Sequence, residues 1–187
     1  MKILVVSDTH GLVPKEIDKF DLIIHCGDIS YFEEDLGKIL KKWDALNLPI
    51  FFIHGNHESQ EAVEFYMKKL KNFKFIHNEI VEFNGIIIGG IGGGGFSYSN
   101  PDTKILEEKL KKFNRIDIFV THAPPYNTLL DLLFEDHVGN LEFRKFIEKY
   151  QPKFAFSGHL HENFQVKDKI GNTILINPGY EGVIIEI

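Results

Sequence analysis

The chain has 187 residues, of which 43% are apolar and 26% are charged, and these proportions are ordinary for a globular protein. This length supports one substantial core and predicts a single domain that spans residues 1–187. No apolar run approaches the length of a membrane span, and the opening MKILVVSDTHG resembles a strand and a polar loop rather than a signal peptide. A cytoplasmic location without membrane attachment is therefore expected.

The charge and cysteine content exclude other classes of function. The net charge of −6 disfavours broad binding to nucleic acid, which normally requires a basic face. Cys26 is the only cysteine, so an internal disulfide and a thiolate metal cluster are both excluded. Any metal ion would have to be held by nitrogen and oxygen atoms.

Short β-branched and aromatic runs alternate with amphipathic helical patterns along much of the chain. The predicted strands lie in residues 2–7, 21–26, 50–54, 86–90, 116–121 and 153–157. Two helices are predicted in 33–46 and 59–70. Two more are predicted to begin after a cap, one at Asp102 or Thr103 and one at Asn140, and their inward-facing residues include Ile105 and Leu141. This alternation favours parallel sheet covered by helices.

Two regions depart from the alternation. Residues 73–90 and 163–187 each have the pattern of consecutive strands, and the second contains a hairpin turn at 171–172. These strand-only regions predict a second, partly antiparallel sheet. The expected fold is one α/β domain with two sheets.

Polar side chains that can bind metals follow five of the predicted strands, just beyond their carboxyl ends. In chain order they are Asp8 and His10, Asp28, Asn56 and His57, His122, and His159 and His161. Ligands of parallel α/β sheets bind at this edge, so these side chains are expected to gather at one place. If the strand pattern continues to the last two histidines, strand alternation sends them to the same side.

The set without His57 contains seven groups, which is more than a single tetrahedral zinc ion uses. Carboxylate, imidazole and amide ligands instead suit two adjacent divalent ions, which together can clamp a phosphorus centre during in-line displacement. Nitrogen and oxygen ligands without sulfur favour Mn²⁺, Fe, Co or Zn over copper. Mn²⁺ is the expected ion, with Fe, Zn, Co and Ni as alternatives.

The motifs DTH (8–10), GD (27–28), GNHE (55–58), TH (121–122) and GHLH (158–161) resemble, in order, the five blocks of the calcineurin-like metallophosphoesterases. The resemblance implies a four-layer αββα sandwich with two mixed β-sheets. It implies that the first metal ion is bound by Asp8, His10, Asp28 and His161, with Asp28 as the bridge. It implies that the second ion is bound by Asn56, His122 and His159.

His57 resembles the catalytic histidine of the family, which contacts the scissile phosphate. The family usually has Asp at the next position, where this chain has Glu58, so the role of Glu58 is open. The implied activity is hydrolysis of a small phosphomonoester or phosphodiester, cyclic nucleotides included, by a hydroxide that bridges two metal ions. The alternative is a non-catalytic scaffold of the same fold that binds a protein partner.

The other histidines and the glycine-rich run have mainly structural interpretations. His25 and His54 lie inside apolar strands and are expected to be packed or to support the ligands. His77 is expected at the surface, and His137 lies in a loop where it could reach substrate or simply face water. The glycine-rich run 89–95 lacks the following helix of a dinucleotide fingerprint and predicts a flexible or tightly turned loop.

Overall fold

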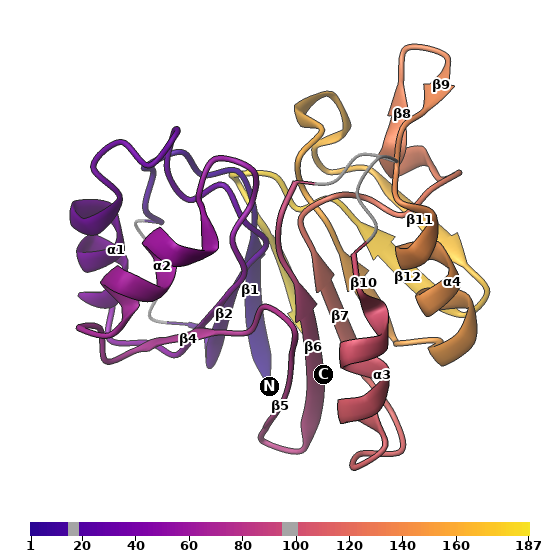
Figure 1. Cartoon of the computed structure of the whole chain (residues 1–187), viewed down its shortest axis with the longest axis horizontal. Helices are drawn as coiled ribbons and strands as arrows, with labels where there is room; N and C mark the ends of the chain where they lie inside the picture. The colour runs from indigo at the N-terminus through magenta and orange to yellow at the C-terminus, as the bar shows by residue number, and fades with distance from the viewer. Residues whose placement is uncertain (15–18, 95–100) are drawn as a thin grey trace.

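The computed structural model describes residues 1–14, 19–94 and 101–187, and Figure 1 shows it as two β-sheets packed face to face. The first sheet has the order β13 (Val183–Glu186), β1 (Lys2–Val6), β2 (Leu22–His25), β3 (Ile50–Phe52) and β4 (Phe73–Phe75). The second has the order β11 (Lys167–Ile170), β12 (Thr173–Ile176), β10 (Phe154–Phe156), β7 (Ile118–Thr121), β6 (Ile86–Ile91) and β5 (Glu79–Phe83). The edge strands β13, β11 and β5 pair antiparallel with their neighbours and the other pairs are parallel.

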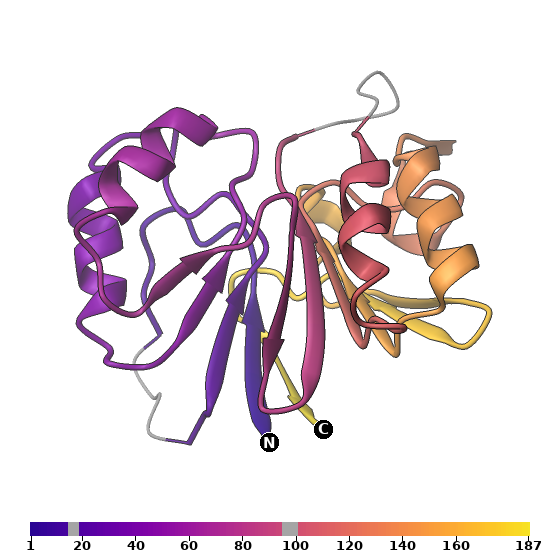
Figure 2. The ribbon, with the colours of Figure 1, turned by 60° about the horizontal axis from the view of Figure 1, so that its bottom comes forward.

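Helices cover the outer face of each sheet (Figures 1 and 2). On the first sheet lie α1 (Leu36–Asp44) and α2 (Gln60–Met67), and on the second lie α3 (Thr103–Leu110) and α4 (Leu141–Tyr150). The four layers confirm the expected αββα sandwich. No helix in the described ranges is both long enough and apolar enough to cross a bilayer.

Strand β1 illustrates how the sequence divides the core. Its alternate residues Ile3 and Val5 lie in the cluster between the two sheets, whereas Leu4 and Val6 pack with the residues of α1. This alternation follows from the period of two in a strand, and a strand that is apolar on both sides is buried on both sides.

Helices α2, α3 and α4 begin at a residue whose side chain caps them, whereas Asp35 before α1 makes no such bond. Ser59 accepts from the Ala62 amide, Asp102 from the Lys104 amide, and Asn140 from the Glu142 and Phe143 amides. Such caps satisfy amide groups that have no partner within the helix. The caps at Asp102 and Asn140 match the prediction. Leu106, Leu110, Phe143 and Ile147 are buried as the helical patterns predict, but Ile105 and Leu141 are exposed.

The strand-only regions contribute to both sheets, and this differs from the sequence-based expectation. Strand β4 pairs with β3 in the first sheet, and the chain then crosses at Ile76, which packs between the sheets, to form β5 and β6 in the second. The hairpin β11–β12 lies in the second sheet as predicted, but β13 returns to pair with β1. The termini consequently meet, and the Ile187 amide donates to the carbonyl of Met1 (Figure 2).

Two smaller features lie beyond the second sheet. The hairpin of β8 (Leu132–Leu133) and β9 (Asp136–His137) projects from the molecule beside a short 3-10 turn, η2 (His161–Asn163). The side-chain amide of Asn163 donates to the carbonyls of Leu130 and Leu132, so this turn anchors the base of the hairpin.

Candidate metal centre

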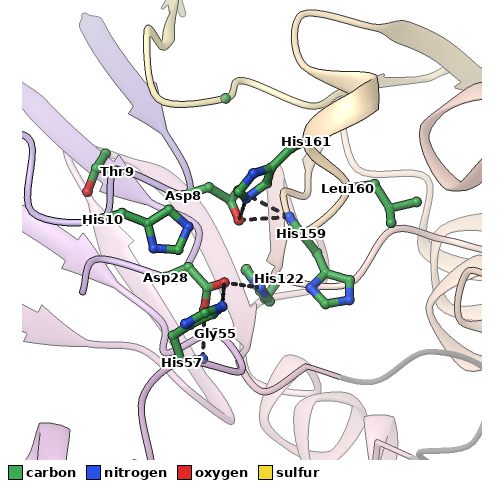
Figure 3. Close-up of polar contacts among 12 residues, drawn as sticks. Asp8, Thr9, His10, Asp28, Gly55, His57, His122, His159, Leu160 and His161 are labelled. Atoms are coloured by element: carbon green, nitrogen blue, oxygen red, sulfur yellow. Dashed lines mark hydrogen bonds and ion pairs between the residues drawn. The ribbon is translucent and has the colours of Figure 1, made fainter. Parts of the chain in front are cut away.

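The structure brings together the polar side chains that follow the five strands (Figure 3). Strands β1, β2 and β3 are adjacent and parallel in the first sheet, and β7 and β10 are adjacent and parallel in the second. The loops that leave these strands therefore emerge at one edge of the sandwich. Backbone hydrogen bonds join the loops, from the Asp8 amide to the Gly27 carbonyl and from the Gly158 amide to the His122 carbonyl.

Two groups of potential ligands meet at this edge, and each combines side chains from both sheets. Asp8, His10 and His161 offer ligand atoms that lie within 4.8 Å of one another, and Asp28, His122 and His159 do the same. In the second group, Nε2 of His122 lies 3.3 Å from Oδ2 of Asp28 and 3.0 Å from Oδ1 of Asn56. In the first, Nε2 of His161 lies 3.4 Å from Oδ1 of Asp8.

The hydrogen bonds of two histidines leave a lone pair directed at each group. Nδ1 of His10 donates to the Ser30 carbonyl at 2.9 Å, and Nδ1 of His122 donates to the Cys26 carbonyl at 2.8 Å. In the neutral form, Nε2 of each ring is then the atom without a proton. Nε2 of His10 is buried without a hydrogen-bond partner, and Nε2 of His122 faces two oxygens. A cation is the partner that such converging acceptors fit, and a carbonyl bond on the other ring nitrogen is typical of metal-binding histidines.

His57 adopts the opposite arrangement. Its Nδ1 accepts from the Phe32 amide at 3.2 Å, so in the neutral ring the proton is on Nε2, which lies 3.7 Å from Oδ2 of Asp28. His57 also lies within ligand range of His10 and Asp28. The bond from Phe32 makes Nε2 a donor toward the site, whereas the same nitrogen of His10 and His122 is an acceptor.

The buried charges of the site are unbalanced without a cation. Burial lowers the pKa of His122, but the Asp28 charge and contact outweigh this effect and raise that pKa to about 9. Burial would raise the pKa of Asp28, but the charge and hydrogen bond of His122 hold it below its ordinary value. A proton on His122 thus supplies the positive charge that the carboxylates require, and a divalent ion would supply the same charge at the same point.

Four of the grouped residues have left-handed backbones. The φ angles are 53° at Asp8, 43° at His10, 55° at Asp28 and 71° at His159. Non-glycine residues in this region are strained and are held there by their surroundings, often at functional sites. The strand alternation expected for His159 and His161 is therefore wrong: β10 ends at Phe156, and the left-handed turn sends the two histidines to different ligand groups.

Glycines of the motifs leave room for the carboxylates. A Cβ on Gly55 would overlap Oδ1 of Asp28, and a Cβ on Gly158 would overlap Oγ of Ser7 and Oδ2 of Asp8. The amide of His159 donates to both oxygens of Asp8, which brings the backbone of that turn close to the carboxylate. Close approach of the backbone thus explains these glycines.

The carboxylate of Glu58 accepts hydrogen bonds from backbone amides and does not orient His57. Its carboxylate is buried and accepts from the amides of Asp28, Ser30 and Gly55 and from the hydroxyl of Ser30, at 2.7–3.2 Å. Burial and the Asp28 charge raise the pKa of Glu58, against the hydrogen bonds from Ser30. The side chain therefore joins the loop after β2 to the loop after β3. The acidic residue was visible in the sequence, but its partners were not.

Three of the remaining histidines make hydrogen bonds away from the two ligand groups, whereas Nδ1 of His54 is buried without a hydrogen-bond partner among the described residues. His25 is fully buried between Thr9 Oγ1 and the Gly27 amide, and burial lowers its pKa to about 3. His77 is half-buried and bonded at both ring nitrogens to Gly92 and Asn78, so its expected surface position is wrong. His137 is not simply solvated, because its Nδ1 lies 2.8 Å from the buried carboxylate of Asp131.

The glycine-rich run is only partly a loop. Gly89 and Gly90 belong to β6, and a Cβ on Gly90 would meet the carbonyl of Ile76 at the crossing between the sheets. Gly94 lies so close to Asn56 that a Cβ there would overlap its side chain. Gly95, the end of the run, lies outside the described residues.

The profile of the calcineurin-like phosphoesterases matches residues 1–163, and the chain belongs to this family. Among curated proteins, the uncharacterized protein MJ1162 of Methanocaldococcus jannaschii is 34% identical, with 95% of this chain and 88% of that protein covered. Purple acid phosphatase 19 of Arabidopsis thaliana is 26% identical, with 82% of this chain but 39% of that protein covered. The crystal structure of TT1561 of Thermus thermophilus shares the fold, with a TM-score of 0.73, 16% identity, and 95% of this chain and 88% of that chain covered.

Proposed function

We propose that this protein is a divalent-metal-dependent phosphoesterase that hydrolyses a small phosphomonoester or phosphodiester. The observation that carries the proposal is the pair of adjoining ligand groups, Asp8, His10 and His161 beside Asp28, His122 and His159. Asp28 is proposed as the ligand shared by the two ions, and Asn56 as a further ligand beside His122. Membership of the phosphoesterase family supports the same chemistry.

Two bound divalent ions, of which Mn²⁺ is the favoured identity, would neutralise phosphate oxygens and lower the pKa of water. The residues of the chain have separate roles around them. The carboxylates of Asp8 and Asp28 and the Nε2 lone pairs of His10 and His122 would hold the cations. The backbone amides of His57 and His159 donate to the two carboxylates and fix their direction.

His57 is the proposed catalytic residue. Its Nε2 proton faces the site because the Phe32 amide occupies Nδ1, so Nε2 can donate to the oxygen that leaves phosphorus. Proton transfer of this kind typically contributes a rate factor of about 10²–10⁴. The net charge of −6 favours a small-molecule substrate over a nucleic acid.

The direct test is to purify the protein, measure its bound metals, and assay bis(p-nitrophenyl) phosphate and p-nitrophenyl phosphate. Chelation is expected to abolish turnover, and Mn²⁺ is expected to restore it. The relative rates on the two compounds distinguish a diesterase from a monoesterase. Bound metal without hydrolysis of either compound, or of a panel of phosphorylated metabolites and cyclic nucleotides, would instead favour a non-catalytic scaffold.

A further inference from the structure

Two exposed aromatic side chains, Tyr31 and Phe32, lie directly beside the candidate centre. They are 57% and 67% exposed, so much of each side chain is open to solvent. The Phe32 ring lies 4.1 Å from the His57 ring, and the Tyr31 ring lies 4.9 Å from it, measured between centroids. Tyr31 also lies 5.6 Å from His10. Both rings thus border the place where a phosphate would bind.

The loop that carries the two rings is held firmly. The Ser30 amide and hydroxyl donate to Glu58, and the Ser59 amide and hydroxyl donate to Glu33 at 2.8 and 2.6 Å. The backbone is left-handed at Phe32 and Glu33, with φ of 47° and 63°. Hydrogen bonds from the surroundings maintain this strained turn. The backbone of the loop therefore holds the two rings at a defined place on the surface.

Neither ring is required by the core. Burial of an aromatic side chain is normally favourable, and these two side chains instead contact each other at 4.9 Å and the histidines of the site. A cleft of about 270 Å³ opens beside Tyr31 and His10, lined also by Glu34, Asp35, Lys38 and Lys42, and Phe32 is not part of its lining. There is consequently space for an organic group attached to a phosphate at the metal centre.

On the basis of the proposed function, we propose that Tyr31 and Phe32 form an aromatic wall that stacks against a planar aromatic substituent of the phosphate ester. The substrate class is then an ester with an aryl group or a nucleobase, in preference to one with a purely aliphatic group. Stacking of one planar group on exposed aromatic side chains changes affinity by about tenfold.

The test is equilibrium binding of phosphonates, which carry the same anion but cannot be hydrolysed as esters. The affinities of phenylphosphonate and methylphosphonate for the Mn²⁺-loaded protein are measured by calorimetry. The wild type is expected to prefer the phenyl compound by about tenfold, and Phe32→Ala and Phe32→Leu are expected to reduce this ratio to near one. Phe32→Trp is expected to retain it. Circular dichroism checks that each variant is folded.

Phe65→Ala is the matched control. Phe65 is 57% exposed and packs with Tyr66 and Lys69, so the same change of an exposed ring on α2 is expected to leave the phenyl preference intact. A second pair of ligands, an adenine-bearing alkylphosphonate and the same alkylphosphonate without the base, distinguishes a nucleobase from a directly attached aryl group.

The outcomes separate this inference from the proposed function. If the wild type hydrolyses bis(p-nitrophenyl) phosphate but binds the aromatic and aliphatic members of both pairs equally, the aromatic wall is refuted. The proposed phosphoesterase activity is then still supported. Retention of the full preference in Phe32→Ala and Phe32→Leu would also refute it. If the wild type shows neither hydrolysis nor phosphonate binding, the proposed function itself fails.

Discussion

Oδ2 of Asp28 lies 3.3 Å from Nε2 of His122, and this contact joins the two sheets of the sandwich. Asp28 follows β2 in the first sheet, and His122 follows β7 in the second. Both side chains are buried, and each shifts the pKa of the other toward its charged form. The centre therefore depends on the packing of two sheets against each other, and not on any one motif.

Replacement Asp28→Asn is expected to remove the shared ligand. Bound metal, measured by plasma mass spectrometry, should fall from about two ions per chain to one or fewer, and turnover by at least about 100-fold. Asp21→Asn is the control, because Asp21 precedes β2 at the opposite end of the same strand and its bond to the Lys2 amide can be kept by an amide oxygen. Full metal content in Asp28→Asn would contradict the bridging role.

Replacement His57→Ala is expected to separate catalysis from metal binding. Because Nε2 of His57 donates toward the site, turnover of bis(p-nitrophenyl) phosphate should fall by about 10²–10⁴ while metal content is retained. The loss should be smaller for a substrate with a better leaving group, which needs less help from a proton donor. An unchanged rate, or a rate that falls in proportion to lost metal, would show that the donor role is wrong.

Replacement Glu58→Ala is expected to destabilise the fold through the loops at the site. Four donors from Asp28, Ser30 and Gly55 would lose their buried acceptor, at a cost of about 3–5 kcal/mol in the free energy of unfolding. Urea unfolding measures the loss. Glu64→Ala, which removes an exposed contact with Gln60, should leave the unfolding curve nearly unchanged. Equal stability of the two variants would rule out this role for Glu58.

Replacement Gly158→Ala is expected to disturb the first ligand group. The added Cβ overlaps Asp8 and Ser7, so metal content and activity should both fall. Gly85→Ala is the matched control, since Gly85 also lies in a loop, has φ of 82°, and has open space where the Cβ would stand. Gly85→Ala should lower the free energy of unfolding by about 1 kcal/mol through backbone strain, without loss of metal. Comparable metal content in the two variants would argue against the steric role.

Acid is expected to destabilise the protein partly through His25. The pKa of His25 is about 3 in the folded state and 6.5 in the reference state, so between these values the unfolded chain binds a proton that the folded chain does not. Stability is then lost as the pH falls from about 6.5 toward 3, with a contribution of up to about 1.4 kcal/mol per pH unit. Urea unfolding at several pH values with a chelator should show a shallower slope for His25→Gln. Parallel slopes for the wild type and His25→Gln would contradict this contribution of His25.

Much of the architecture could be predicted from local patterns. Runs such as 2–7 and 116–121 are apolar enough to be recognised as buried strands, and Asp102 and Asn140 were identifiable as caps. The assignment of strands to sheets could not be predicted, because β4 and β13 contain the same kinds of apolar residue as the strands of either sheet. Their partners are decided by packing at residues such as Ile76, which has no local signature.

The sequence by itself determined the kinds of ligand and their order, because residue type and position relative to the strand ends are local properties of the chain. Only the tertiary structure decided which ring nitrogen faces the site and that Glu58 binds backbone rather than His57. Those features depend on left-handed turns and on carbonyls such as that of Cys26, 96 positions away from His122 along the chain. Such contacts exist only after the two sheets have packed, so no spacing within the sequence could reveal them.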